Sequence, residues 1–392
     1  MKSRSLFFTS PTVATALLAV AAGVLPAGEP PSISGAKSTA TKAPSELDKL
    51  WNLAVLYKNK DNPWLQEISL FGRINVNWAN VDTDAGDWSD WEARRVRAGV
   101  KVKFLQSLEL KTEVRFLPFE DEIYDGLTEA SLTWTASPAF RLGIGKQLPR
   151  YLLEGAISAN ELLTVERSHL AGTFWVGEDN FSTGVTAAGD IGKWSYSAGI
   201  YSAENDKQWG KLNAGFYGVA SLAYDFGEAL HLEKAVVRGD FAYNNGDTAN
   251  TTPKPFEQVY ALGLDAKQGR FGLQTNAAFG TGLRSQPDVW GLVIMPSYRL
   301  SDQWELVTRY TFLHSEGADG LKPVRRYENE VDDINGTKGD QYQAIYAGLN
   351  HYLYGNKLKI QAGVEYSWME DKADNGGKYA GWSFLTGFRF YF

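Results

Sequence analysis

The stretch Trp382–Phe392, WSFLTGFRFYF, closes the sequence with a strict two-residue alternation. Every second residue counted back from Phe392 is apolar except Thr386, and the residues between them form a mixed, more polar set. An alternation of period two predicts a β-strand with two unlike faces. On a soluble protein, such an aromatic strand would be an aggregation-prone edge. A closed transmembrane barrel has no edge and places aromatic rings at the water boundary, so the stretch predicts an outer-membrane β-barrel.

Residues 1–27 have the composition of a targeting segment. Lys2 and Arg4 precede an apolar stretch from Val13 to Val24, and Leu25–Ala27 provide a small-residue cleavage site. The apolar run is shorter than the ~20 residues that a spanning helix needs. We therefore predict a signal peptide, with a membrane anchor as the alternative.

Residues 28–64 are predicted to be a periplasmic linker followed by a short helix. Residues 28–43 are rich in Ser, Thr, Ala and Lys, which is typical of a flexible linker. The helix is expected from Ser45 to Asn59, where Ser45 and Asp48 resemble a capping box. Its leucines recur at helical spacing, at positions 47, 50, 53 and 56. We expect the helix to plug the periplasmic mouth of the barrel or to pack under it.

The composition excludes several classes of protein. Mean hydropathy is −0.30, and no stretch after the N-terminal segment is apolar enough to span a membrane as a helix. The absence of cysteine excludes a disulfide framework, a thiolate nucleophile and a cysteine metal site. A net charge of −7 argues against nucleic acid as a partner.

Sixteen alternating segments of about 10 to 16 residues follow one another from Gln66 onward. Each is long enough for a tilted transmembrane strand, and bacterial barrels have an even number of strands. The segments are 66–81, 90–104, 107–117, 125–136, 138–147, 179–189, 192–203, 212–226, 230–245, 256–268, 269–283, 287–300, 303–316, 339–354, 356–370 and 379–392. Their connections alternate between short turns and longer polar loops, as expected if both termini are periplasmic, and only 284–286 is short where a long loop is expected. Residues 65–392 are therefore predicted to be an all-β, transmembrane antiparallel β-barrel.

Several of these segments have clearly different faces. In 303–316 and 356–370, one parity is apolar, and the other carries charged and polar residues such as Glu305, Arg309 and Lys359. The parity of 339–354 is ambiguous. A polar interior within about 16 strands predicts a water-filled channel.

Cations are concentrated on one face of Trp91–Phe104, WEARRVRAGVKVKF. Rows of Arg and Lys along a pore favour anions. The alternative is that these cations pair with Glu109, Glu113 and Glu129 on neighbouring strands. Arg94 has lipid-facing parity and is expected at the outer rim, near lipopolysaccharide. The predicted channel-lining cations are Arg73, Arg95, Arg97, Lys101, Lys103, Lys111 and Arg115.

The connection 148–178 has 31 residues, far more than an ordinary hairpin loop. We predict that it folds into the barrel and narrows the channel, and an extracellular flap is the alternative. Its mixed charges predict weak selectivity. The predicted constriction residues are Arg150, Glu154, Glu161, Glu166 and Arg167.

No catalytic, metal or cofactor site is predicted. The four histidines lack metal-ligand spacing, and neither a Gly-x-Ser-x-Gly nucleophile motif nor a phosphate-binding glycine loop is present. Acidic loop residues are expected to be solvated and not to hold divalent cations. A hydrolase triad is defined by geometry and not by a motif, so an outer-membrane hydrolase stays an alternative.

Six stretches, in order, carry a resemblance to a known family. They are LFGRINVNW (70–78), WEARRVRAGVKVKF (91–104), RLGIGKQLPRYLLE (141–154), ELLTVERS (161–168), WGLVIMPSYRL (290–300) and GWSFLTGFRFYF (381–392). From about residue 66 to residue 392, the chain resembles the phosphate-selective porin O and P family of Gram-negative outer-membrane porins. The resemblance implies a sixteen-stranded homotrimer with an inward-folded loop.

One position departs from the pattern of this family. Leu148 stands where the family commonly has a lysine, with Lys146 and Arg150 on either side, which leaves the substrate open. We predict a porin and not an enzyme, passing small hydrophilic solutes by diffusion with a mild preference for anions, phosphate among them. A non-selective or oligosaccharide-permissive porin and a structural surface barrel are further alternatives.

Overall fold

The structure is a computed structural model that describes residues 46–119, 121–177, 180–204, 206–250 and 255–392. The predicted signal peptide 1–27, the linker and Ser45 lie outside the described residues. Within the described ranges, no helix combines the length and the apolar character needed to cross a bilayer.

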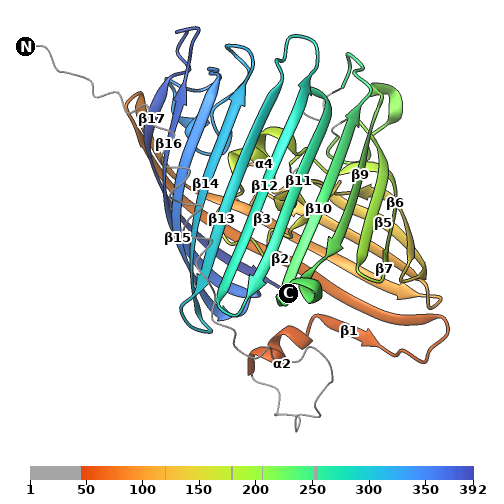
Figure 1. Ribbon diagram of the computed structural model, residues 1–392. Helices are drawn as coiled ribbons and strands as arrows, with labels where there is room; N and C mark the ends of the chain where they lie inside the picture. The colour runs from red at the N-terminus through yellow and green to blue at the C-terminus, as the bar shows by residue number, and fades with distance from the viewer. Residues whose placement is uncertain (1–45, 120, 178–179, 205, 251–254) are drawn as a thin grey trace, which may run out of the picture. The chain divides into compact units, whose positions relative to one another are not determined.

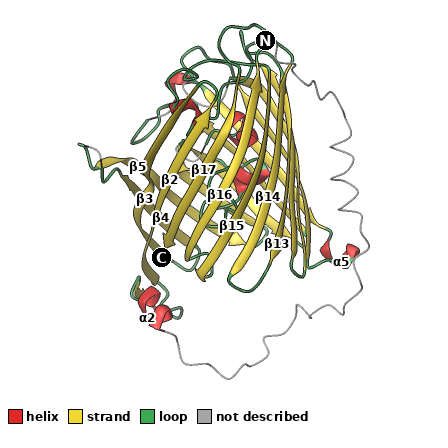
Figure 2. Ribbon diagram, turned by 90° about the vertical axis from the view of Figure 1, so that its left-hand side faces the viewer, coloured by secondary structure: helices red, strands yellow, loops and turns green. Residues whose placement is uncertain are grey.

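Sixteen antiparallel strands, β2 to β17, form a closed barrel, which confirms the predicted fold class (Figures 1 and 2). The ring closes because β17 pairs with β2 and β9 pairs with β10. The observed ends lie within four residues of the predicted segments. The strands are β2 (Leu65–Thr83), β3 (Gly86–Phe104), β4 (Leu108–Phe116), β5 (Tyr124–Ser137), β6 (Phe140–Gln147), β7 (Ser182–Ile191), β8 (Trp194–Ser202), β9 (Phe216–Asp225), β10 (Lys234–Asn244), β11 (Phe256–Gln268), β12 (Phe271–Gly282), β13 (Val289–Arg299), β14 (Trp304–Ser315), β15 (Gln341–Tyr354), β16 (Leu358–Glu370) and β17 (Tyr379–Tyr391).

The two faces of the wall follow the predicted alternation. On β14, Trp304 and Leu306 are exposed on the outside, whereas Glu305 and Arg309 are buried on the inside. The parity of β15, which the sequence leaves ambiguous, is resolved by its burial pattern. Its buried inward row includes three tyrosines, at positions 342, 346 and 352. The barrel therefore has an apolar outside and a polar inside.

The connections alternate between the two ends of the barrel. The short turns lie at one end, here called the short-turn end, which also holds the start of β2 and the end of β17. One of these turns contains the short helix α5 (Gly227–Leu230). The longer connections lie at the opposite, long-loop end, with one exception: β2 and β3 are joined there by residues 84–85 alone, where the sequence predicted a longer loop, 82–89. They contain α3 (Leu153–Ala156), α4 (His169–Phe174) and the 3-10 turns η1 (Leu212–Ala214) and η2 (Glu328–Glu330).

The helix predicted for residues 45–59 is shorter than expected. Helix α2 spans only Glu46–Asn52, and a short strand β1 (Val55–Lys58) follows it. β17 ends opposite Arg73, and Phe392 exchanges two backbone hydrogen bonds with Gly72. The edge of β2 from Leu65 to Phe71 therefore has no partner from this strand, and β1 pairs with part of it. Trp51 packs against Tyr354 and Phe390, so α2 lies against the rim of the barrel at the short-turn end (Figures 1 and 2).

Candidate channel constriction

The loop between β6 and β7, described from residue 148 to 177, lies inside the barrel. Helix α3 contacts β11, and α4 contacts β12, β13 and β14. Figures 1 and 2 show helical turns within the ring of strands. Phe174 of α4 packs against Phe256, with 5.1 Å between the ring centroids, and both rings are buried. The predicted insertion of this loop is therefore observed, and the extracellular flap is not.

Polar side chains of the wall bind the backbone of this loop. Irregular backbone inside a barrel leaves carbonyl groups that need hydrogen-bond donors. Five side chains of β14–β17 supply them to residues 162–166. Lys359 Nζ and Gln361 Nε2 donate to Leu162 O (2.8 and 3.0 Å), Asn350 Nδ2 to Leu163 O (2.8 Å), Arg389 Nη2 to Val165 O (2.8 Å), and Arg309 Nη1 to Glu166 O (2.9 Å).

Arg309 is the centre of this attachment. Its guanidinium is buried, lies 2.8 Å from Glu365 Oε2 and 3.9 Å from Glu154 Oε1, and stacks on Tyr346. Glu154 in turn accepts hydrogen bonds from the backbone N–H and the hydroxyl of Ser168, and it is almost fully buried. The predicted constriction residue Glu154 therefore holds the loop together and does not face the channel.

The other four predicted constriction residues differ in their exposure. Arg150 and Glu161 are exposed, whereas Glu166 and Arg167 are half-buried. Arg167 donates to two carbonyls of its own loop, Glu154 O at 2.8 Å and Ile157 O at 2.9 Å, and stacks on Trp175. Of the five, only Arg150 and Glu161 are thus exposed residues, and Arg150 Nη1 donates to Ala156 O at 3.1 Å.

A β-bulge in β3 changes the predicted position of Arg94. Asn75 pairs with Arg95, but Asn77 pairs with Glu92, so β3 has one extra residue in this register. A bulge re-aims the side chains around it. Arg94 is only 4% exposed, and its Nε lies 3.1 Å from Glu166 Oε1. The prediction that Arg94 faces lipid at the outer rim is therefore wrong.

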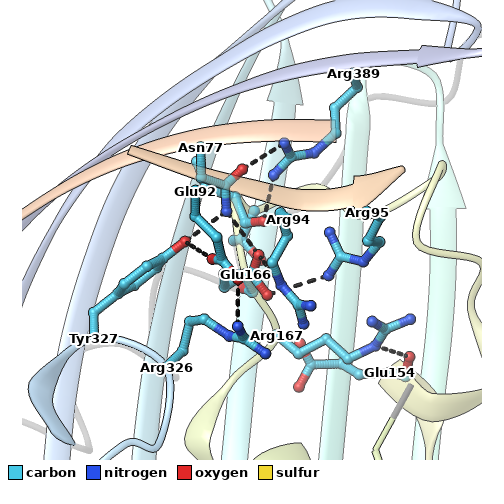
Figure 3. A network of polar contacts seen from close by, with 12 residues as sticks. Asn77, Glu92, Arg94, Arg95, Glu154, Glu166, Arg167, Arg326, Tyr327 and Arg389 are labelled. Atoms are coloured by element: carbon cyan, nitrogen blue, oxygen red, sulfur yellow. Dashed lines mark hydrogen bonds and ion pairs between the residues drawn. The ribbon is translucent and has the colours of Figure 1, made fainter. Parts of the chain in front are cut away.

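Glu166 receives three donors from the wall (Figure 3). Besides Arg94, Arg95 Nη2 lies 3.3 Å from Glu166 Oε2, and Asn77 Nδ2 donates to Oε1 at 2.9 Å. Asn77 Oδ1 accepts from Arg389 Nη1 at 2.6 Å, which orients the amide. A loop carboxylate thus occupies a binding position that two arginines and an amide form.

The cations of the predicted row are paired with carboxylates, as the alternative prediction had it. Glu113 lies 3.6 Å from both Arg73 and Arg97, and both Arg97 and Glu113 are buried. Nearer the short-turn end, the pairs are more exposed. They are Lys101–Glu67 (3.0 Å), Lys103–Glu67 and Lys103–Glu109 (both 3.9 Å) and Lys111–Glu129 (2.6 Å). Toward the long-loop end, Arg115 pairs with Asp125 (3.2 Å).

A cavity of about 510 Å³ lies between the inserted loop and the β14–β15 loop. Among its lining residues are five arginines and three glutamates: Arg94, Arg167, Arg309, Arg325, Arg326, Glu166, Glu328 and Glu365. The sequence predicted no role for Arg325 and Arg326, because its pattern indicated only a long polar loop at this position. Arg326 bonds to Glu92 on β3, which holds that loop against the wall (Figure 3).

Glu328 differs from the other two glutamates of the cavity. It lies on η2, is buried, and accepts a hydrogen bond from Ser367 Oγ at 3.3 Å. Burial, together with the neighbouring carboxylate of Glu365, raises the pKa of Glu328 to about 8. At neutral pH the carboxyl group of Glu328 is mainly protonated and uncharged. The five arginines of the cavity therefore face only two charged glutamates.

The residues that the structure describes contain no group of three His, Asp or Glu side chains placed to hold a metal ion.

Comparison with known proteins places this geometry among porins. The model of the family described as phosphate-selective porin O and P matches residues 70–392. An anion-selective porin from Comamonas acidovorans has 12% identity and a TM-score of 0.57, with 82% of this chain and 99% of that chain covered. OmpF of Salmonella typhi in complex with daunomycin has 13% identity and a TM-score of 0.57, with coverage of 86% and 100%. OprB of Pseudomonas putida, in a high-pH structure, has 10% identity and a TM-score of 0.57, with coverage of 83% and 94%. No curated protein matches the chain.

Proposed function

The chain belongs to the phosphate-selective porin O and P family, and from that premise we propose that this outer-membrane porin lets small hydrophilic solutes diffuse passively, with a mild preference for anions. The inserted loop binds to β14–β17, contacts β11–β13 and reaches β2 and β3 through Glu166. We therefore expect solutes to pass along the part of the β2–β5 wall that lies between Glu166 and the short-turn end. That wall carries the partly exposed lysines Lys101, Lys103 and Lys111. Arg150 and Glu161 supply the exposed charges of the loop.

The exposure of the ion pairs supports the preference for anions. Lys103 is 45% exposed, whereas its partner Glu67 is 14% exposed, and the Lys101–Glu67 and Lys111–Glu129 pairs differ in the same direction. In each pair the lysine side chain is more exposed than the side chain of its acidic partner. A passing ion therefore meets positive charge first, although each pair is close to neutral. The greater exposure of the lysines than of their acidic partners is the observation on which the proposal rests.

Phosphate enters the proposal only as one of several small anions. Leu148 stands where the family commonly has a lysine, and the two arginines nearest the bulge are engaged with Glu166. The likeness to the anion-selective porin from Comamonas acidovorans supports the view that this fold can favour anions. An oligosaccharide-permissive porin is not favoured, because such a channel would expose aromatic rings along its path for sugars to stack on. The inward tyrosines at positions 342, 346 and 352 are buried and not exposed to the channel.

Recording of single channels in planar bilayers tests the proposal. We expect stepwise conductance, and a reversal potential in a KCl gradient displaced toward the chloride equilibrium potential. A barrel that shows no conductance would contradict the porin function and favour an enzyme or a structural barrel. A reversal potential displaced toward potassium would contradict only the preference for anions.

The remaining expectations are part of the same proposal. We expect residues 1–27 to be removed as a signal peptide, both termini to be periplasmic, and three copies to assemble in contact with outer-membrane lipid and lipopolysaccharide. Mass spectrometry of the mature protein and sedimentation of the detergent-solubilised barrel test the first and third expectations. Proteolysis of intact cells tests the second.

A further inference from the structure

Helix α2 has an apolar face that the barrel covers only in part. Leu47, Leu50 and Trp51 stand at positions i, i+3 and i+4 and therefore share one face. Trp51 is 7% exposed, but both leucines are exposed, and Leu53 and Leu56 beyond the helix are 73% and 60% exposed. A contiguous exposed apolar surface of this kind marks a contact with a membrane or another protein.

The contacts of Trp51 show which way this face is directed. Its ring lies 4.8 Å from that of Tyr354 and 5.5 Å from that of Phe390, and Nε1 donates to Tyr391 O at 2.6 Å. Phe390 has the same parity as Phe384 and Phe388, which are exposed on the outside of β17. Trp51 therefore packs on the outer side of the rim at the short-turn end. Figure 2 shows α2 at this end, near the C-terminus.

We propose that α2 and the residues after it lie in the headgroup region of the adjoining lipid leaflet, with Leu47, Leu50, Leu53 and Leu56 against the acyl chains. An amphipathic segment binds in this way when its apolar face enters the boundary between headgroups and acyl chains. The partner is a phospholipid surface. Residues 46–56 thus act as an interfacial anchor beside the barrel, and this role does not depend on the ion selectivity of the pore.

Two observations favour lipid over a second copy of the chain. Trp51, on the same helix face as Leu47 and Leu50, packs against Phe390, whose parity puts it with Phe384 and Phe388 on the outward surface that faces lipid in a membrane barrel. Lys357 Nζ lies 5.8 Å from the ring centroid of Trp51 and 5.4 Å from that of Tyr354, which puts a cation and an indole together at one level. Cations and tryptophan are the residues expected at a headgroup boundary.

Site-directed spin labelling tests the proposal, because the sequence contains no cysteine. Leu53 is exposed, so a label on the cysteine of Leu53→Cys disturbs no packing in the barrel. Leu306→Cys on the outside of β14 provides the lipid-facing control. Asp61→Cys, exposed in the same N-terminal segment, provides the aqueous control. Each labelled variant is reconstituted into phosphatidylethanolamine–phosphatidylglycerol vesicles, and collision rates with oxygen and with a water-soluble nickel chelate are measured.

We expect the ratio of oxygen to nickel collisions at position 53 to match that at position 306 and to exceed several-fold that at position 61. A ratio equal to that at position 61 would place the segment in water and overturn the proposal. Low rates with both reagents, together with spin–spin broadening, would show contact between copies and would overturn it as well.

Discussion

Arg94 on β3 and Glu166 on the inserted loop meet inside the barrel, with 3.1 Å between Nε and Oε1. The loop thus brings its own carboxylate to the row of wall cations, and Arg95 and Asn77 bind the same group. Charge-assisted hydrogen bonds of this kind are stronger than neutral ones. A mobile anion at this end of the row must therefore compete with Glu166, which fits a mild rather than a strong preference for anions.

Replacement of this carboxylate is expected to strengthen the preference for anions. Glu166→Gln keeps the size of the side chain but removes the negative charge that Arg94 and Arg95 bind. We expect the reversal potential in a KCl gradient to move further toward the chloride equilibrium potential. Glu161→Gln removes the same charge from an exposed position on the same loop and serves as the control. Equal shifts in the two variants would show that only the net charge of the loop matters.

Removal of the exposed lysines is expected to have the opposite effect. In Lys101→Gln with Lys103→Gln, Glu67 and Glu109 lose their partners on the channel wall. We expect the reversal potential to move toward potassium, by an amount that decreases at high salt because these charges are screened. Lys193→Gln, whose partner Glu228 lies at a short turn, is the matched control. If the double variant and this control had the same reversal potential, the role of the lysines would be contradicted.

The strands could be predicted from the sequence because water and lipid impose opposite demands on the two faces of each strand. Lumen residues such as Glu305 and Lys359 therefore alternate with lipid-facing Trp304 and Ile360. Short turns leave little freedom in where a strand ends, so the observed ends differ by at most four residues. The same alternation assigned the lumen face of β3 correctly from Arg95 to Lys103.

Three features could not be predicted because they depend on tertiary contacts. The bulge that turns Arg94 inward adds one residue to β3, and a fixed period of two cannot reveal it. Strand β1 forms because β17 ends opposite Arg73, which is a property of the register and not of residues 55–58. The pairing of Lys101 with Glu67 requires the alignment of β2 with β3.

The attachment of the inserted loop is expected to depend on Arg309. Arg309→Met removes the partner of buried Glu365 and the donor to Glu166 O. Loss of one member of a buried ion pair costs about 3–5 kcal/mol, because the other charge is left without compensation. We therefore expect a lower thermal unfolding temperature and a larger, noisier single-channel conductance as the loop loosens.

A second substitution separates the charge from the attachment. In Arg309→Met with Glu365→Leu, the carboxylate nearest to Arg309 is removed as well, and buried Glu154 keeps its hydrogen bonds from Ser168, so we expect part of the stability to return. The conductance is expected to stay high, since Glu166 O still lacks its donor. An unchanged conductance in both variants would mean that the other wall contacts are sufficient to fix the loop.

The stability of the barrel is expected to depend on pH through Glu328. Burial raises the pKa of this carboxyl to about 8, whereas in the unfolded chain it is about 4.3. The folded state therefore binds the proton more tightly, and its stabilising contribution is complete below about pH 4.3 and is lost as the pH rises toward 8. Each unit of pKa difference is worth about 1.4 kcal/mol. Glu328→Gln mimics the protonated form, so the free energy of unfolding of this variant should fall less than that of the wild type between these pH values. Parallel curves for the two proteins would show that Glu328 titrates normally and that other carboxyls set the pH dependence.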